Sequence, residues 1–422
     1  MIWLITPEST RESAAALEGE AVASPAMSAL GSNPRLLCIF HALQMSLFPM
    51  AILTVFFRHD IGMSMGEIML LQGAFGLVMA LFEFPSGYLA DRIGYRRSLM
   101  IASVLNALGW SMYVRAETIP EILMAEAVLG IGISLISGTD TALLYESLEE
   151  TGQEARFGSW TGKVKFFGQF GEGSAAILAG FLYAHWHRMP FLLEAGIWVV
   201  NLAVAWQLVE PARHRPPMQE NWKQVKSMVR HVALEDKRLR AIVVLTIVLG
   251  MSSFVPVWTI QLYATDAGLP ASALGIVWAA ANYSVALGSL ISTRSVVALG
   301  LARLLVICIA LIAFAYAGMG LTHAVWGVGF YFALTLMRGL FGPSLHHEEQ
   351  RRIPSTDRAG FVSLRSLTFR VAFLVLGPTV GLAIDTWGQH PVLLALGALL
   401  SSAACVGLWM MARAGALGRA SE

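Results

Sequence analysis

A short charged segment, residues 87–97, interrupts a strongly apolar region of the chain. It reads Gly87-Tyr88-Leu89-Ala90-Asp91-Arg92-Ile93-Gly94-Tyr95-Arg96-Arg97. Gly87 and Gly94 allow a tight turn and a close contact between helices. Asp91 can stand at a helix N-terminus, where the helix dipole favours a carboxylate, or it can pair with a basic side chain. Because long apolar runs flank the segment, we expect it to connect two membrane-spanning helices.

The composition of the whole chain is that of an integral membrane protein. Of its 422 residues, 56% are hydrophobic and 14% are charged, and the mean hydropathy is +0.62. A soluble domain carries roughly 25% charged residues, so this chain has too little charge to cover soluble surfaces. The net charge of +1 provides no basic surface for nucleic acid. The cysteines lie inside apolar runs, as small buried side chains do, and not as disulfide partners or metal ligands: Cys38, Cys308 and Cys405.

Apolar runs of about 20 residues, long enough to cross a bilayer, recur along the chain and predict an all-α membrane protein with twelve spans. The continuous runs favour helices, because a transmembrane barrel shows short alternating segments instead. The predicted spans are 35–57, 67–89, 98–115, 119–146, 160–184 and 190–209 in the first half, and 240–263, 272–293, 302–321, 323–345, 360–384 and 391–412 in the second.

The spans divide into two six-helix bundles, predicted over residues 34–209 and 240–412. Residues 1–33 are predicted to form a disordered cytoplasmic tail, and residues 413–422 a short second tail. The linker, residues 210–239, has apolar residues at helical spacing with basic residues between them. This pattern predicts an amphipathic helix, either lying on the inner leaflet or solvated as a simple linker.

The distribution of basic residues predicts that both termini are cytoplasmic. Lys and Arg concentrate in the termini and in the loops that follow even-numbered spans, whereas only Arg58, Arg115 and Arg188 fall in the opposite loops. An even number of spans requires the same arrangement. A weak internal repeat supports two related halves, since similar tripeptides follow spans 4 and 10: Arg156-Phe157-Gly158 and Arg358-Ala359-Gly360.

The segment 87–97 resembles the signature loop of the major facilitator superfamily, Gly-x-Leu-Ala-Asp-Arg-x-Gly-Arg-Lys. It stands where that family has the motif, after the second of twelve spans, and the division into six plus six spans matches as well. The resemblance implies a transporter that works by alternating access. The second-half copy, residues 288–303, has no acid at the Asp position, so only one of the two cytoplasmic gates is well specified.

The resemblance also implies that the motif closes the cytoplasmic side by linking span 2 to span 11, together with an acid at the inner end of span 4. Tyr95 departs from the family pattern, which has an arginine there, so we expect the charge relay to pass through Arg96. Anchoring of the topology alone would equally account for Arg96 and Arg97. The implied gate residues are Gly87, Asp91, Arg92, Gly94 and Arg96 of the motif, the matching acid Glu146 and the matching base Arg358.

The signatures of proton-coupled drug exporters in this family are half present. Span 4 carries Glu126 where those exporters have the arginine of Arg-x-x-x-Gly. Span 5 is rich in glycine but lacks the usual Gly-Pro-x-x-Gly, and a Gly-Pro-x-x-Gly element stands instead at 377–381 in span 11. Residues 83–87 and 137–140 resemble a branch of bacterial facilitators that mixes drug-efflux-like proteins with metabolite and siderophore exporters.

Ionisable residues inside spans mark either function or a buried pair, because each costs about 2.5–3.5 kcal/mol at mid-bilayer. A proton-coupled carrier needs a carboxylate whose proton affinity changes between a dry and a wet environment, and Glu126 and Glu172 qualify. A structural pair of Glu172 with Arg370 is the alternative. The residues predicted to bind protons or substrate are Glu126, Glu172, Arg338, His41 and Gln44, although His41 fits a helix-packing role better.

The sequence therefore predicts a secondary transporter that exports a small organic molecule, such as a drug, metabolite or siderophore, by proton-coupled alternating access. We expect a monomeric multi-pass protein of the bacterial inner membrane, with protons as coupling ion and the lipid bilayer around it. We expect no enzymatic activity, cofactor, metal or nucleic-acid partner, and His346-His347-Glu348-Glu349 is interpreted as the polar end of an inner loop. Two alternatives remain, uptake of a metabolite by proton symport and a non-transporting membrane sensor with the same fold.

Overall fold

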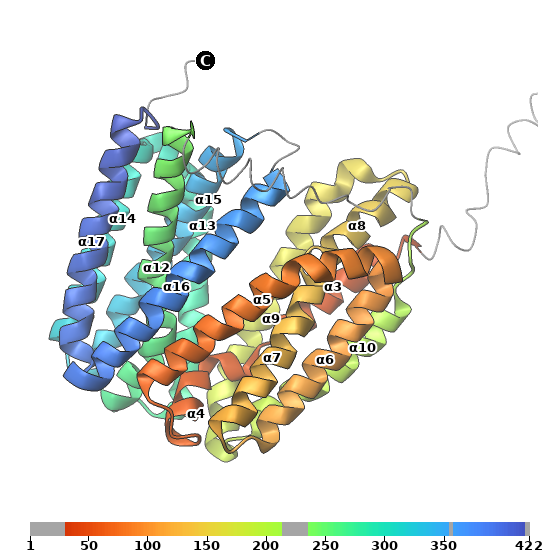
Figure 1. The fold of residues 1–422 in the computed structure, drawn as a ribbon, viewed down its shortest axis with the longest axis horizontal. Helices are drawn as coiled ribbons and strands as arrows, with labels where there is room; N and C mark the ends of the chain where they lie inside the picture. The colour runs from red at the N-terminus through yellow and green to blue at the C-terminus, as the bar shows by residue number, and fades with distance from the viewer. Residues whose placement is uncertain (1–29, 213–234, 354–357, 418–422) are drawn as a thin grey trace, which may run out of the picture.

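The computed structural model describes residues 30–212, 235–353 and 358–417. Most of the predicted N-terminal tail and of the predicted linker helix lies outside these residues. The described chain is all-helical, and its helices form two bundles (Figure 1). The first bundle consists of α3 (Asn33–Gln44), η1 (Phe48–Ala51), α4 (Leu53–His59), α5 (Met65–Ile93), α6 (Tyr95–Arg115), α7 (Ile119–Ile136), α8 (Thr139–Glu150), η2 (Glu154–Arg156), α9 (Phe157–His185) and α10 (Met189–Gln207).

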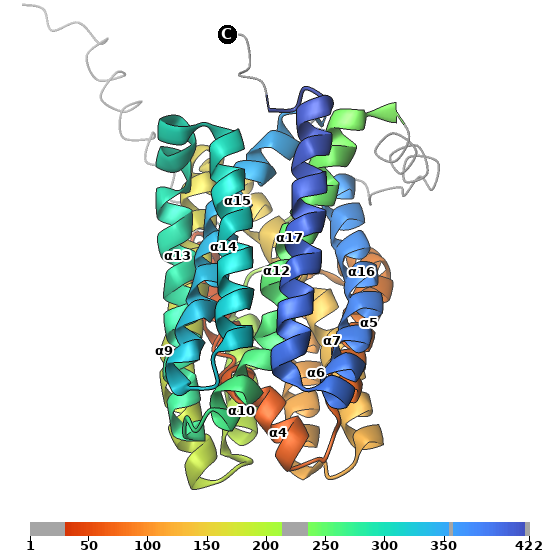
Figure 2. The ribbon, with the colours of Figure 1, turned by 90° about the vertical axis from the view of Figure 1, so that its left-hand side faces the viewer.

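The second bundle repeats the pattern of long helices joined by short turns. The C-terminal helix ends beside the start of α12, at the same end of the molecule as the start of α3 (Figures 1 and 2). We call this the inner end, because the basic loops predict that it faces the cytoplasm, and we call the opposite end the outer end. The bundle consists of α12 (Lys237–Asp266), η4 (Ala271–Ala273), α13 (Leu274–Leu299), α14 (Leu301–Leu321), η5 (Val325–Phe330), α15 (Tyr331–Gln350), α16 (Arg358–Trp387) and α17 (Gln389–Arg413).

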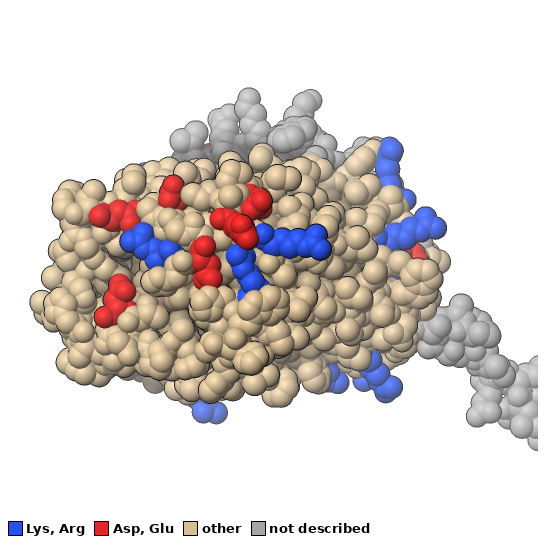
Figure 3. All heavy atoms as spheres, turned by 90° about the horizontal axis from the view of Figure 1, so that it is seen from below, with Lys and Arg blue, Asp and Glu red and all other residues tan. Residues whose placement is uncertain are grey.

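The helices follow the predicted spans, with two of them less apolar than the rest. Among the described residues, ten helical segments are both long and apolar enough to cross a membrane. The remaining two predicted spans, 98–115 and 160–184, correspond to α6 and α9, which have 21 and 29 residues. Both are long enough to cross but carry basic or polar side chains along much of their length. Figure 3 shows the outer end, where a few acidic and basic side chains are scattered among uncharged ones.

Two predicted spans are broken, and each break has a local cause. Span 1 consists of α3 and α4, which are separated by the 3-10 turn η1 with Pro49 at its start, where a missing N–H is tolerated. Span 4 consists of α7 and α8, which are separated at Gly138, whose φ of +83° is a conformation that glycine adopts readily. The breaks let each span change direction inside the bundle.

The two bundles meet along two antiparallel helix pairs. α5 packs along α16, and α9 packs along α13 (Figures 1 and 2). At the outer end, α4 and η1 of the first bundle also contact α12 and α13. Buried apolar side chains form one continuous cluster through both bundles.

The internal repeat predicted from the sequence has structural counterparts. The tripeptides at Arg156 and Arg358 lie at the starts of α9 and α16. Gly94 and Gly300 occupy equivalent turns, between α5 and α6 and between α13 and α14, with φ of +106° and +81°. Each halts one helix and serves as the N-cap of the next.

Candidate transport site

Glu172 of α9 lies in the contact between the two bundles and bonds to the second one. Its Oε1 accepts hydrogen bonds from Trp278 Nε1 at 3.2 Å and Asn282 Nδ2 at 3.1 Å. Both donors belong to α13 and lie four residues apart, on one face of that helix. Its Oε2 accepts a bond from Gln169 Nε2 of its own helix at 3.3 Å. The carboxylate of Glu172, near the middle of α9, therefore joins the two bundles.

Small residues bring α9 and α13 close enough for these bonds. A Cβ on Gly275 would lie 2.0 Å from the carbonyl oxygen of Ala176, and a Cβ on Gly180 would lie 2.4 Å from that of Ser272. Real Cβ atoms do not approach this closely, so only glycine fits at either position. The closest approach of α9 to α13 lies on the outer side of Glu172.

Arg338 is exposed on α15 and makes no hydrogen bond or ion pair with any residue that the structure describes. It follows the buried Tyr331 by seven residues, two helical turns, so both lie on one face of α15. α15 packs along α13, the helix whose Trp278 and Asn282 bind Glu172. The predicted cation and the predicted carboxylate thus belong to one region, without a direct contact between them.

The alternative pair of Glu172 with Arg370 does not form. Arg370 lies in the other contact between the bundles, where its Nη1 donates to the carbonyl oxygen of Gly76 at 3.1 Å. It therefore links α16 to α5, whereas Glu172 links α9 to α13.

Glu126 lies inside the first bundle. Its side chain is only 6% exposed, and its Oε1 accepts bonds from the hydroxyl of Tyr113 and, at 3.4 Å, from Gln72 Nε2. The ring of Tyr113 stacks on Phe191, with 5.2 Å between the ring centroids. Glu126 is thus enclosed by α5, α6 and α7 and an aromatic cluster, and its hydrogen bonds within the described part of the chain stay inside the first bundle.

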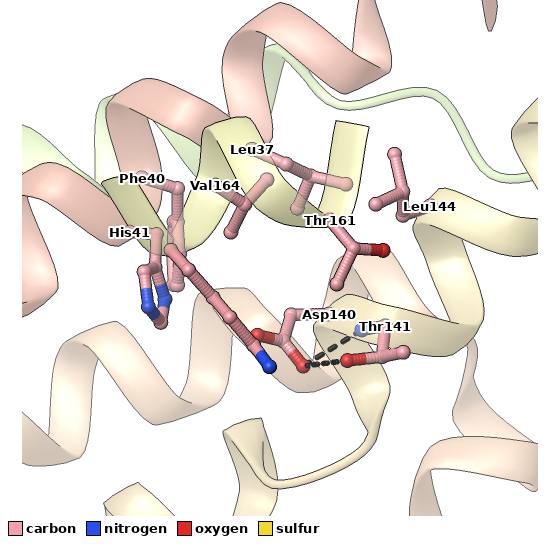
Figure 4. A pocket seen from close by; sticks show the side chains of 9 residues that line it. Leu37, Phe40, His41, Asp140, Thr141, Leu144, Thr161 and Val164 are labelled. Carbon is pink, nitrogen blue, oxygen red and sulfur yellow. Dashed lines mark hydrogen bonds between the residues drawn. The ribbon is translucent and has the colours of Figure 1, made fainter. Parts of the chain in front are cut away.

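His41 and Gln44 lie on α3 beside α9. The His41 ring fills the space that a side chain on Gly168 would need, since a Cβ there would lie 2.5 Å from His41 Cδ2. Among the described residues, His41 Nδ1 and Gln44 Oε1 are buried without a hydrogen-bond partner. His41 also borders a small, partly open hollow between α3, α8 and α9 (Figure 4). Its polar lining comprises His41, Asp140, Thr141, Thr161 and Lys165.

At the inner end, the motif loop contacts Glu146 through Tyr95. The Tyr95 hydroxyl donates to Glu146 Oε1 at 2.8 Å. Arg96, which we expected to take over the relay, instead donates to the carbonyl oxygen of Trp206 and lies over its ring. The phenol of Tyr95 therefore takes the position of the family's arginine and supplies a hydrogen bond to Glu146.

The side chains of Asp91 and Arg92 make no hydrogen bond or ion pair with the second bundle among the residues that the structure describes. Gly94 adopts the expected turn. No described atom of another helix lies within 4 Å of a Cβ placed on Gly87, so the described residues show no close helix contact there. Arg92 lies over the ring of Tyr88 at 4.6 Å. Asp91 makes no hydrogen bond or ion pair within the described part of the chain. Arg358 is the first residue of α16, and its side chain is not among those that the structure describes.

Two buried acids were missed by the sequence analysis. Glu194 of α10 is 0% exposed and accepts bonds from the backbone N–H of Phe48 and from Trp198 Nε1. Glu349, assigned to a polar loop end, is also 0% exposed, and it joins Arg365 of α16 to α15. The sequence signal that could have identified Glu194 is its position as an acidic residue inside the predicted span 190–209.

The fold and these sites define a membrane transporter and not an enzyme. The chain belongs to the major facilitator superfamily, whose family model matches residues 36–375. It is similar in fold to the nucleoside transporter NupG, with a TM-score of 0.74, 14% identity and coverage of 90% of this chain and 98% of that one. It is similarly close to the POT family transporter PepTSo, with a TM-score of 0.73, 14% identity and coverage of 91% and 98%.

Sequence relatives are resistance proteins of bacteria. One is the "Putative multidrug resistance protein MdtD" of Pectobacterium atrosepticum, 30% identical over 137 residues, which are 32% of this chain and 28% of that protein. Another is the methyl viologen resistance protein SmvA of Salmonella typhimurium, 26% identical over 146 residues, which are 34% of this chain and 29% of SmvA. The similarity thus spans less than a third of the length of either relative.

Proposed function

We propose that this transporter exports a small organic molecule from the cytoplasm in exchange for protons. The observation that carries the proposal is the position of Glu172, whose carboxylate bridges the two bundles through Trp278 and Asn282. In alternating access, one bundle moves against the other around a central site. A titratable group that bonds across the moving contact is suited to couple that motion to a proton.

The coupling follows from the hydrogen-bonding capacity of a carboxyl group. An ionised Glu172 only accepts, and the donors at its two oxygens satisfy it. Addition of a proton removes the negative charge, so the bonds from Trp278 and Asn282 to Oε1 lose their charge assistance, and a proton on Oε1 itself would face donors that cannot accept it. Protonation therefore weakens the bond between α9 and α13, and deprotonation restores it.

Arg338 is the candidate for contact with substrate. It is exposed on α15, the helix that packs along α13, and has no partner in the described part of the chain. An unpaired guanidinium can bind a carboxylate or another anionic group of an organic molecule. The names of MdtD and SmvA favour export over uptake.

The bacterial relatives support an inner-membrane location, and we propose that the protein acts as a monomer. Each six-helix bundle supplies one side of the contact that contains Glu172, so a single chain provides the complete site.

Transport into everted membrane vesicles tests the proposal. Vesicles with the full chain are given a panel of anionic, neutral and cationic organic molecules, and the uptake of each and the lumenal pH are followed with and without a proton gradient. We expect gradient-driven uptake with alkalinisation of the lumen. Glu172→Gln should reduce uptake to the level of vesicles without the protein, because an amide cannot exchange a proton. Glu154→Gln, an exposed acid on η2, is the matched control and should transport normally.

The outcomes separate the alternatives. Uptake that ignores the gradient would contradict proton coupling but not the fold. Substrate movement of the opposite sign, with alkalinisation outside right-side-out vesicles, would indicate symport into the cell. If a panel of anionic, neutral and cationic organic molecules is not moved at all, the non-transporting sensor becomes the better interpretation.

A further inference from the structure

Asp385, near the end of α16, binds the first turn of α5 in the other bundle. Its Oδ1 accepts the backbone N–H of Met65 at 2.9 Å, and its Oδ2 accepts that of Gly66 at 2.7 Å. One carboxylate thus bonds two successive N–H groups across the contact between the bundles. Charge-assisted bonds of this kind are about twice as strong as neutral ones.

The two N–H groups are those that α5 cannot satisfy itself. The first four N–H groups of a helix have no partner inside it. At the start of α5, the side-chain oxygen of Ser64 accepts the N–H of Glu67 at 3.2 Å, and its carbonyl oxygen accepts that of Ile68 at 3.0 Å. Only the N–H groups of Met65 and Gly66 are left over, and Asp385 of the other bundle takes both.

The backbones touch beside this bond. A Cβ on Gly381 would lie 2.5 Å from the carbonyl oxygen of Met65, and a Cβ on Gly66 would lie 2.9 Å from Leu382 Cδ2. A second side chain bridges the bundles at the same end, because Gln261 accepts the N–H of Thr54 and donates to the carbonyl oxygen of Met50, both at 2.9 Å. The outer end is therefore closed by close-packed, directional contacts.

The residues around Asp385 repeat the spacing of the motif loop at the other end of the molecule. Gly381, Asp385 and Gly388 are spaced as Gly87, Asp91 and Gly94 are. In both copies the last glycine has positive φ, +81° at Gly388 and +106° at Gly94, and is the N-cap of the following helix. α5 and α16 lie side by side and antiparallel, so the two acids lie at opposite ends of the same helix pair.

We propose that Asp385 is the latch of the outer end, the counterpart of the motif loop at the inner end. It holds the start of α5 while the outer end is closed, and it must release Met65 and Gly66 before that end opens. In the present structure Asp385 is bound, whereas Asp91 has no partner among the described residues. This arrangement is expected when the outer end is shut.

Distances between spin labels at the outer end test the latch in the full-length protein. Cys38, Cys308 and Cys405 are replaced by alanine, and cysteines are introduced by Glu117→Cys in the first bundle and Ala324→Cys in the second. Both positions are exposed. We expect Asp385→Asn to increase the population of molecules with a long distance between the labels, relative to the population with a short distance, by about tenfold. A change of this size corresponds to the loss of one charge-assisted hydrogen bond. Asp266→Asn is the control, since it removes the same charge from an exposed position at the outer end.

A second variant opens the same contact without touching the acid. Gly381→Ala inserts a methyl group against the carbonyl oxygen of Met65 and should shift the distances in the same direction. Gly196→Ala, where a Cβ would meet nothing within 4 Å, should leave them unchanged. The latch is overturned if neither variant changes the distances, or if Asp266→Asn changes them equally. The measurement needs no substrate, so its result is independent of the export proposal.

Discussion

Glu194 illustrates at the scale of one residue how burial is decided by distant parts of the chain. It lies near the start of α10, a position where an acid could equally face water. Its side chain is completely buried because η1, about 145 residues earlier, folds over it and donates the N–H of Phe48. The turn at Pro49 that positions η1 is local, but its packing on α10 is not. No pattern near Glu194 in the sequence contains that information.

Glu194→Ala should therefore destabilise the first bundle. Loss of the carboxylate leaves the N–H groups of Phe48 and Trp198 buried without acceptors, at about 1–3 kcal/mol each, and it leaves a cavity. We expect a lower midpoint of thermal unfolding in detergent. Glu194→Gln should retain most of the stability, because its carbonyl oxygen can still accept a bond. Equal midpoints for the alanine variant and the unmodified protein would contradict this role.

At the scale of elements, hydropathy predicts where helices are but not which faces meet. The positions of twelve spans, the motif turn at Gly94 and the glycine-rich surface of span 5 were all predictable, because each depends on neighbouring residues. The partners of Glu172 were not, because Trp278 and Asn282 reach it only when α9 crosses α13. Likewise Arg370 lies in a span as predicted, yet it binds Gly76 on the opposite contact. Pairings between helices depend on the whole bundle.

The crossing of α9 and α13 should tolerate no larger side chain at its closest point. Gly275→Val places a branched side chain where even a Cβ lies 2.0 Å from Ala176 O, and overpacking of this kind costs about 1–3 kcal/mol. We expect α9 and α13 to separate, Glu172 to lose its partners and vesicle transport to fall. The control is Gly196→Val, which makes a similar change where the space is open. Normal transport by the Gly275→Val protein would show that the crossing is not required.

At the scale of the whole molecule, orientation determines what each end of the fold can do. The positive-inside pattern places the termini in the cytoplasm, and the structure puts the start of α3 and the end of α17 at one end (Figure 1). The pattern therefore predicts that the motif loop faces the cytoplasm and that Asp385 faces the opposite side of the membrane. The charge pattern alone suffices for this prediction because a bilayer admits only two orientations.

Reporter fusions check the orientation. Green fluorescent protein attached after Glu422 should fluoresce, because it folds in the cytoplasm. Alkaline phosphatase joined after Ala324, between α14 and α15, should be active, because it requires the periplasm. If green fluorescent protein were fluorescent at Ala324 and dark at Glu422, the protein would have the opposite orientation, with the motif loop outside and Asp385 inside.

The contact of Tyr95 with Glu146 has a consequence for osmotic stress. An ion pair at a membrane surface weakens as salt accumulates, because the Debye length falls from about 10 Å at 0.1 M to about 3 Å at 1 M. Here the donor is a neutral phenol, so the contact does not depend on attraction between opposite charges. When a cell takes up salt after a rise in external osmolarity, the added ions would weaken an arginine–glutamate ion pair at this position. The hydrogen bond from Tyr95 to Glu146 should keep its strength.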